Sequence, residues 1–167
     1  MVFISAGSNI EPEKNICRGI EELSSELEII AISSAIWTPP IGPAIQDEYL
    51  NCVVMAQCSI PPLHLKYRVL RRIEAMTGRK RTADRFAPRT LDLDILLFGN
   101  RRYDGRRLKI PDPDIYTRQF LPFLISELNP ELIMPDTGIK ISSLVSSKDF
   151  NVDEELTKKL RKLVHSV

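Results

Sequence analysis

Two aspartates separated by one residue, Asp92 and Asp94, are the first feature of this sequence that could carry chemistry. They lie in an apolar run at 90–98 that predicts a strand. Side chains two apart on a strand share a face and lie about 6.5 Å apart. Two carboxylates at this spacing can hold one or two hard cations, and Mg²⁺ combines such carboxylates with substrate phosphates. A solvated acidic strand face is the structural alternative.

Positive charge is concentrated directly before these aspartates. Only Glu74 and Asp84 oppose nine basic residues between positions 66 and 89, so this stretch carries +7 and the remainder −6. Such a local field favours an anionic ligand, although a solvated helix face followed by a charged loop gives the same count. Beside a metal site it suits phosphoryl transfer. The basic residues are Lys66, Arg68, Arg71, Arg72, Arg79, Lys80, Arg81, Arg85 and Arg89.

The elements that must position these residues follow from the apolar pattern. Strands are expected at 2–6, 29–37, 49–58 and 90–98. One helix begins at Pro12, and a second is capped by Ser59 and ends at Gly78. The order β-α-β-β-α-β predicts an α/β (α+β) fold of the ferredoxin-like class, with a mainly antiparallel sheet. The buried helical stripes are expected at Ile16, Ile20, Leu23 and Leu27, and at Leu63, Tyr67, Leu70 and Ile73.

Strand faces and C-terminal additions complete this prediction. In the third strand Leu50, Cys52 and Val54 should share one face. In the fourth, Leu91, Leu93, Ile95 and Leu97 should lie opposite the two aspartates, which share their face with Leu96 and Phe98. Beyond residue 101 a helix is expected at 116–128 and an amphipathic helix at 152–164. No repeat or linker divides the chain, so one domain, 1–167, is predicted.

The composition excludes several classes of protein. The 167 residues are 43% hydrophobic and 27% charged, with a net charge of +1, as in a globular protein without a nucleic-acid-binding coat. Three cysteines without C-x-x-C spacing favour a reducing compartment over a disulfide scaffold. The N-terminus lacks a signal-peptide pattern, and no apolar run reaches membrane-spanning length. We therefore expect a cytoplasmic protein with no membrane partner.

Other common catalytic motifs are absent. The sequence has no P-loop, no G-x-G-x-x-G and no H-E-x-x-H, so any nucleotide must be held in another way. His64 and His165 are expected to be structural or to face solvent. Trp37 could stack on a ligand or fill the core.

The run 85–97, RFAPRTLDLDILL, resembles the signature of the 6-hydroxymethyl-7,8-dihydropterin pyrophosphokinase family of folate biosynthesis. Gly7-Ser8-Asn9, the proline-rich loop 38–43, Tyr49-Leu50-Asn51 and Arg118-Gln119-Phe120 follow in the expected order. The resemblance spans about residues 1–145 and leaves the C-terminal helix, within 151–167, uncovered.

The resemblance implies transfer of diphosphate from ATP to the pterin hydroxymethyl group, with release of AMP and participation of two Mg²⁺ ions. Asp92 and Asp94 would ligate the metal, and Arg79 and Arg89 would be catalytic. The residues implied to bind ATP are Arg71, Glu74, Arg79, Arg89, Ile95 (through its backbone) and Arg118. Those implied to bind the pterin are Thr38, Pro39, Ile41, Gly42, Tyr49, Asn51 and Phe120.

Three positions depart from the family pattern. Asp112 stands where the family usually has His, so a carboxylate replaces one contact to phosphate. Arg71 stands where Gln is frequent and could compensate by adding positive charge. Phe86 occupies a position that is Trp in some members.

Two other functions remain alternatives. A ferredoxin-like RNA-binding module could use the basic stretch, although no RNP1 pattern is present and the paired aspartates would repel a phosphate backbone. A regulatory domain could bind nucleotide without reacting. The leading hypothesis predicts a monomer whose partners are ATP and the dihydropterin, with no nucleic acid. Formation of AMP only when the dihydropterin is present would separate it from both alternatives.

Overall fold

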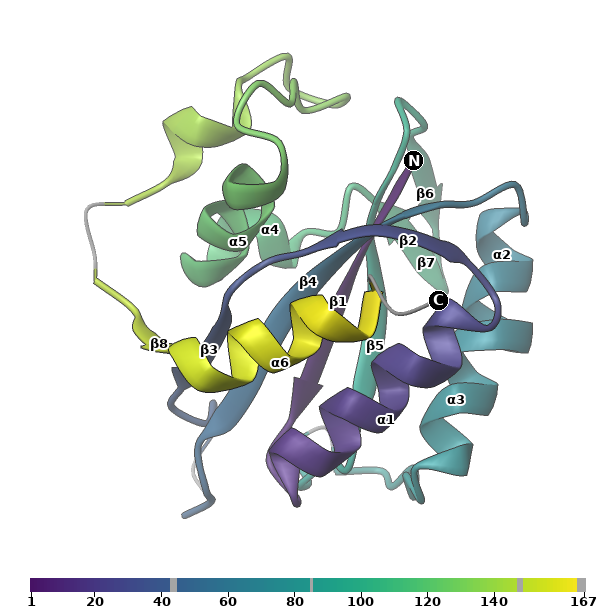
Figure 1. Cartoon of the computed structure of the whole chain (residues 1–167). Helices are drawn as coiled ribbons and strands as arrows, with labels where there is room; N and C mark the ends of the chain where they lie inside the picture. Colours follow the sequence, from purple (N-terminus) through teal and green to yellow (C-terminus); the bar gives the residue numbers. More distant parts are fainter. Residues whose placement is uncertain (43–44, 85, 147–148, 165–167) are drawn as a thin grey trace.

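A six-stranded sheet forms the centre of the molecule (Figure 1). The computed structural model describes residues 1–42, 45–84, 86–146 and 149–164. The spatial order is β5-β1-β4-β3-β8, β2 pairs with β4 beside β3, and every pairing is antiparallel. The strands are β1 (Val2–Ser8), β2 (Glu28–Ile32), β3 (Ala35–Thr38), β4 (Tyr49–Gln57), β5 (Asp92–Phe98) and β8 (Asn151–Asp153).

Helices cover both faces of the sheet, and each face has its own apolar core. Helices α1, α3 and α6 pack on one face, while α4, α5 and η2 cover the other and lie at the upper left of Figure 1. No helix in the described ranges is long and apolar enough to cross a membrane. The helices are α1 (Pro12–Ser24), α2 (Pro62–His64), η1 (Leu65–Leu70), α3 (Arg71–Met76), α4 (Asp114–Thr117), α5 (Phe120–Leu128), η2 (Ile141–Leu144) and α6 (Glu154–Val164).

The mixed α/β architecture with an antiparallel sheet confirms the coarse prediction. Pro12 opens α1, as its position in the sequence predicted. The alternation predicted for the third strand is also confirmed, because Leu50, Cys52 and Val54 lie in the core beneath α1 while Val53 belongs to the other core. The free cysteines and the exposed His64 agree with the sequence, whereas His165 lies outside the described residues.

The predicted second strand, 29–37, is wrong as a single element because it is interrupted at Ser33 and Ser34. The Ser33 hydroxyl accepts the Val53 backbone N–H at 2.8 Å. Glu127 of α5 accepts hydrogen bonds from the backbone N–H and the hydroxyl of Ser34, at 2.7 and 2.8 Å. Side chains thus satisfy the backbone between β2 and β3, and the glutamate that does so is distant in sequence.

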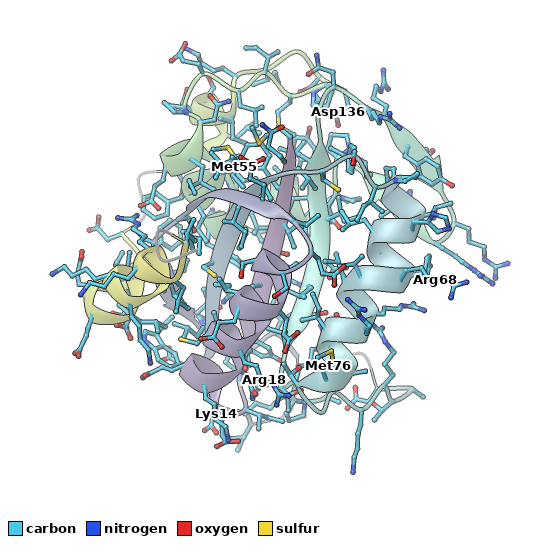
Figure 2. All side chains as sticks on the ribbon, turned by 45° about the vertical axis from the view of Figure 1, so that its right-hand side comes forward. Lys14, Arg18, Met55, Arg68, Met76 and Asp136 are labelled. Atoms are coloured by element: carbon cyan, nitrogen blue, oxygen red, sulfur yellow. The ribbon has the colours of Figure 1, made fainter. Side chains whose placement is uncertain are left out.

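The second predicted helix contains a π-helical stretch, η1, which changes the face that it buries. Leu65 and Val69 are buried, whereas Leu63, expected in the core, is 40% exposed. Tyr67 is only half-buried. A π turn holds more residues than an α turn, so the buried stripe departs from α-helical spacing. Figure 2 shows the exposed Arg68 on the outer side of this segment.

The ends of this helical segment differ in how well the sequence predicted them. Pro61 precedes the first helical residue and no side chain caps it, so the expected Ser59 cap is wrong. Gly78 follows α3 with φ +83°, as expected of a residue that ends a helix.

β5 carries the two aspartates as predicted, but a bulge alters the facing of its last residues. Its register against β1 shifts between Phe3 and Ile4. As a result Phe98 joins the core beneath α1, while Leu96 and Leu97 lie in the core beneath α5. The face predicted for Leu96 is confirmed, whereas those predicted for Leu97 and Phe98 are wrong, because the extra residue of a bulge breaks the two-residue period.

The C-terminal part forms more elements than expected. The helix predicted at 116–128 is two helices, α4 and α5, and a small hairpin of β6 (Tyr103–Gly105) and β7 (Leu108–Ile110) precedes them. The helix predicted at 152–164 begins at Glu154, after β8. Trp37 packs against the core beneath α6 and donates its indole N–H to Asp153 at 3.2 Å, which favours its core role.

Candidate active site

A polar cavity of about 530 Å³ lies where the loop after α3 meets the start of β5. The η1–α3 segment, that loop, β5 and the β6–β7 hairpin contribute its walls. Six cationic side chains and two carboxylates line it, which makes it strongly positive. The lining residues are Lys66, Tyr67, Arg71, Arg79, Arg81, Arg89, Asp92, Leu93, Asp94 and Arg107.

Five residues that the sequence analysis selected therefore meet in one cavity: Arg71, Arg79, Arg89, Asp92 and Asp94. Lys66 and Arg81 also line the cavity; both belong to the basic stretch 66–89, but no individual role was predicted for them. Tyr67 was expected in a buried helical stripe rather than in a site, and Arg107 was not selected at all. Arg107 lies in the turn of a hairpin whose position beside β5 no local pattern indicates.

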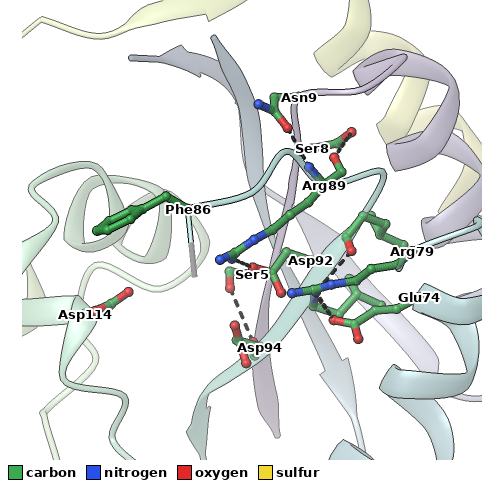
Figure 3. Close-up of polar contacts among 12 residues, drawn as sticks. Ser5, Ser8, Asn9, Glu74, Arg79, Phe86, Arg89, Asp92, Asp94 and Asp114 are labelled. Atoms are coloured by element: carbon green, nitrogen blue, oxygen red, sulfur yellow. Dashed lines mark hydrogen bonds and ion pairs between the residues drawn. The ribbon is translucent and has the colours of Figure 1, made fainter. Parts of the chain in front are cut away.

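Asp92 is the centre of an ion-pair network (Figure 3). One of its oxygens pairs with Arg79 and the other with Arg89. Although burial opposes its ionisation, these two guanidinium groups hold the pKa of Asp92 below its usual value. The carboxylate is therefore fully ionised at neutral pH.

Glu74 lies beneath the cavity and supports this network. Its side chain is 3% exposed and pairs with Arg79 at 2.5 Å and with Arg81. It also accepts the backbone N–H of Leu93 at 3.0 Å. Burial raises the pKa of Glu74 despite these partners. Glu74 is absent from the cavity lining, so its predicted contact with nucleotide stays a prediction.

Asp94 is held differently from Asp92. Its carboxylate lies 3.4 Å from the Lys66 ammonium, and its side chain is 42% exposed. Desolvation and the neighbouring charge of Asp92 raise the pKa of Asp94 to about 6. One carboxylate of the pair is thus saturated by arginines, and the other has a long contact to a lysine.

Asp112 is partly engaged by the backbone. Its carboxylate accepts the Asp114 N–H at 2.8 Å, and its own N–H donates to the Leu96 carbonyl at 2.8 Å. Burial raises the pKa of Asp112, whereas Lys66 and Arg118 act to lower it. The carboxylate therefore lies within the electrostatic reach of the cavity, at the start of α4.

Tyr49 and Asn51 project from β4 near the cavity. Burial raises the pKa of the Tyr49 hydroxyl, and the charges of Arg89, Asp92, Arg79 and Arg118 also act on it. The Asn51 amide donates to the Thr38 hydroxyl at 2.8 Å. A Cβ at Gly7 would lie 2.8 Å from the Asn51 side-chain oxygen, so the glycine leaves the space that this amide needs.

Asn9 connects the loop that precedes β5 with the loop that precedes β4. Its side-chain oxygen accepts the Arg89 N–H at 2.7 Å, and its own N–H donates to the Arg89 carbonyl at 3.1 Å. Its amide also donates to Gln46, which in turn donates to the Phe86 carbonyl at 2.6 Å. The first turn thus fixes the backbone of Arg89 and links it to the loop that precedes β4.

Phe86 also meets the proline-rich loop. Gly42 has φ +121°, and a Cβ there would lie 2.8 Å from the Phe86 ring, so the ring packs directly on the glycine. Pro39 and Ile41 of this loop are exposed, as is Gly42. Pro43 and Arg85, which belong to the motifs quoted above, lie outside the described residues.

Ile95, Arg118 and Phe120 are absent from the cavity lining, as are Glu74 and the pterin-binding candidates of β4 and the loop 38–42. The Ile95 side chain is buried in the core, so only its backbone could reach a ligand. Arg118 pairs with Asp114 at 2.7 Å, and Phe120 begins α5 and packs partly against its core. Their predicted roles in ATP and pterin binding stay predictions.

The carboxylate pair suits a hard divalent cation. Asp92 and Asp94 offer oxygen donors from one strand, and Mg²⁺ commonly combines such donors with water and phosphate. Within the described residues no group of three or more His, Cys, Asp and Glu side chains forms a cage for a metal. The donor set therefore fits an ion held jointly with a phosphate ligand.

Comparisons with known proteins show the family of this chain. Residues 3–130 match the family described as 7,8-dihydro-6-hydroxymethylpterin-pyrophosphokinase. The chain belongs to this family. It is 36% identical over 158 residues to the 2-amino-4-hydroxy-6-hydroxymethyldihydropteridine pyrophosphokinase of Pseudomonas aeruginosa, covering 93% of this chain and 96% of that protein.

Two further relatives carry the same name. The Haemophilus influenzae protein is 36% identical over 146 residues, covering 86% of this chain and 89% of its own. The Synechocystis protein is 33% identical over 149 residues, covering 87% and 75%.

Proposed function

We propose that this chain transfers the terminal diphosphate of ATP to the hydroxymethyl group of 6-hydroxymethyl-7,8-dihydropterin and releases AMP, as a step of folate biosynthesis. The observation that carries the proposal is the juxtaposition of Asp92 and Asp94 with six cationic side chains in one cavity. Membership of the pyrophosphokinase family supports the same reaction. Cation and anion sites side by side are what diphosphate transfer requires.

The cationic walls of the cavity would hold the triphosphate. We assign Arg79 and Arg89 to the charge that develops in the transition state, because both already face the carboxylate pair. Arg71 would bind ATP from η1–α3, and Arg118 from the loop before α5. The backbone of Ile95 would contact adenine. One observation supports this contact. The Leu93 N–H points out of the sheet edge, where Glu74 accepts it, and the backbone groups of Ile95, two residues further along β5, point the same way.

Asp92 and Asp94 would hold Mg²⁺, and we propose that two ions bind. Magnesium bound there would offset the negative charge of the phosphates. The arginines of Asp92 would then be available to the phosphates, since the metal would take their place on the carboxylate. Arg79 would keep its second partner, Glu74, and so stay in position.

The pterin would lie beside β4. Tyr49 and Phe120 would stack on its ring, and Asn51 would hydrogen-bond its polar edge, together with the loop residues Thr38, Pro39, Ile41 and Gly42. The hydroxymethyl oxygen attacks the β-phosphorus, and the bond from that phosphorus to the bridging oxygen of AMP breaks. Positioning and electrostatic stabilisation lower the barrier without a strong protein base.

Several properties of the whole protein belong to this proposal. The order β-α-β-β-α-β, with β4 and β5 flanking β1, supports the ferredoxin-like class. We further propose a single domain, 1–167, that acts as a monomer in the cytoplasm and binds neither nucleic acid nor membrane.

The deciding experiment follows AMP formation from ATP by the purified protein with Mg²⁺. We expect AMP only when 6-hydroxymethyl-7,8-dihydropterin is present, in equal amount to the pyrophosphorylated pterin. A chain that binds ATP but forms no AMP under these conditions would be a nucleotide-binding domain instead. Retention of single-stranded RNA with a strong salt dependence would favour the RNA-binding alternative.

A further inference from the structure

The π-helical stretch η1 brings two cationic residues onto one wall of the cavity. The Arg71 N–H donates to the Lys66 carbonyl, the five-residue spacing that defines a π turn. Lys66 and Arg71 therefore lie one above the other, and both line the cavity. The Arg71 guanidinium stacks over the Tyr67 ring at 4.2 Å, which fixes this wall.

Lys66 has a specific partner in this arrangement. Its ammonium lies 3.4 Å from the Asp94 carboxylate, and its side chain is 21% exposed. Among the residues that the structure describes, it is the one cationic group that forms an ion pair with Asp94. At this length the contact is a weak one, so a stronger cation can replace it at little cost.

We infer that Lys66 is a further phosphate-binding residue, which occupies Asp94 when no metal is bound and turns to the triphosphate when a divalent cation takes its place. This inference rests on the proposed function. A divalent cation between Asp92 and Asp94 competes directly with the ammonium for Asp94. The phosphates that arrive with it offer a stronger acceptor in the same cavity, within the range of a flexible four-carbon side chain.

The exchange has a distinctive thermodynamic consequence. Removing the ammonium relieves competition for Asp94, so metal should bind more tightly in the absence of nucleotide. Removing the same ammonium deletes a phosphate contact, so ATP should bind more weakly. Loss of a purely structural lysine would not shift the metal affinity and the ATP affinity in opposite directions.

The test compares Lys66→Met with Lys109→Met. Lys109 forms an ion pair of the same type and length, 3.4 Å, with Asp104, but both side chains are more than half exposed and neither lines the cavity. Mn²⁺ binding without nucleotide is measured by electron paramagnetic resonance. ATP binding at saturating Mg²⁺, without pterin, is measured by calorimetry. Melting temperatures of both variants are recorded in the same buffers.

We expect Lys66→Met to bind Mn²⁺ roughly three- to fivefold more tightly and ATP about tenfold more weakly, with Lys66→Arg recovering most ATP affinity. Lys109→Met should change neither. Equal values for Lys66→Met and Lys109→Met, or a joint loss of both affinities with a lower melting temperature, would overturn the inference. Failure of the wild type to form AMP would instead count against the proposed function, because the binding measurements do not depend on turnover.

Discussion

Asp92 and Asp94 are equivalent in the sequence, but their environments differ. Two arginines stabilise the Asp92 anion, whereas Asp94 has a long contact to Lys66 and a pKa raised to about 6. Metal binding would therefore change the charge balance mainly at Asp94. Substitution of either residue by Asn would remove a proposed metal ligand, but only Asp92→Asn would weaken two close ion pairs.

We expect Asp92→Asn and Asp94→Asn each to lose most Mg²⁺-dependent turnover, with opposite effects on stability. Asp92→Asn should lower the free energy of unfolding by about 2 kcal/mol, because two charged hydrogen bonds weaken. Asp94→Asn should raise it at pH 7 by roughly 1 kcal/mol, a value already reduced for solvent screening. Denaturation without metal and turnover at saturating Mg²⁺ and ATP check both. Near-normal turnover in both variants would exclude the metal assignment.

The same pKa predicts how this difference depends on pH. A carboxylate whose pKa is higher in the folded protein binds protons more readily there, so its ionisation lowers stability as the pH rises. The stability advantage of Asp94→Asn should therefore be absent near pH 4, grow up to about pH 6, and stay constant above it. Parallel curves for the wild type and Asp94→Asn, measured with a metal chelator, would show that Asp94 has an ordinary pKa. The exposed Asp104→Asn is the control.

At the scale of single elements, loops and turns rather than strand interiors hold the arginines in position. The turn after β1 holds both backbone groups of Arg89 through Asn9 and connects them through Gln46 to Phe86. This places Arg89 over Asp92 at the entry to β5. Asn9, which is uncharged and is not among the lining residues of the cavity, thus holds the backbone of the charged Arg89 in position.

Asn9→Ala should reduce turnover while ATP affinity changes less, because Arg89 would lose its fixed position. A loss of roughly ten- to a hundredfold in kcat is expected for such misplacement. Asn15→Ala is the matched control, since Asn15 is equally buried (5% exposed) but its side-chain amide donates to the Ile10 carbonyl, just before α1. Both variants should lose about 1–2 kcal/mol of stability. Equal kcat values in the two variants would contradict a positioning role for Asn9.

At the scale of the whole molecule, the C-terminal segment is part of the main core although it follows the family match. Leu156 and Leu160 of α6 are buried with residues of α1 and β4. The Thr157 hydroxyl accepts the Ala35 N–H at 2.8 Å, and β8 pairs with β3. This segment therefore closes the sheet edge opposite to the cavity on β5.

Leu160→Ala should cost about 3 kcal/mol of stability, as expected for a cavity left by a fully buried leucine. Turnover well below the melting temperature should stay unchanged, because α6 packs against α1, β2, β3 and β8, whereas the cavity lies at β5 on the opposite edge of the sheet. Chemical denaturation and kinetic assays on the same preparation check this. Leu63→Ala, at a 40% exposed position, is the control and should lose much less stability. A large loss of turnover in Leu160→Ala would connect α6 to the site.

The sequence by itself determined the features that depend on local pattern. Alternation placed Asp92 and Asp94 on one face of a strand, Pro12 and Gly78 marked helix ends, and the element order predicted the mixed α/β architecture. The family motifs selected five residues that now share one cavity. Each of these depends on spacing along a short stretch of chain.

Only the tertiary structure decided the features that depend on distant partners. Glu127 interrupts the second strand, the bulge in β5 redirects Leu97 and Phe98, and the π turn brings Lys66 to the cavity. The hairpin adds Arg107 to the same cavity. The unequal states of Asp92 and Asp94 belong to this group as well. A carboxylate's pKa depends on which charges surround it and how much water it keeps, and both are set by residues from other parts of the chain.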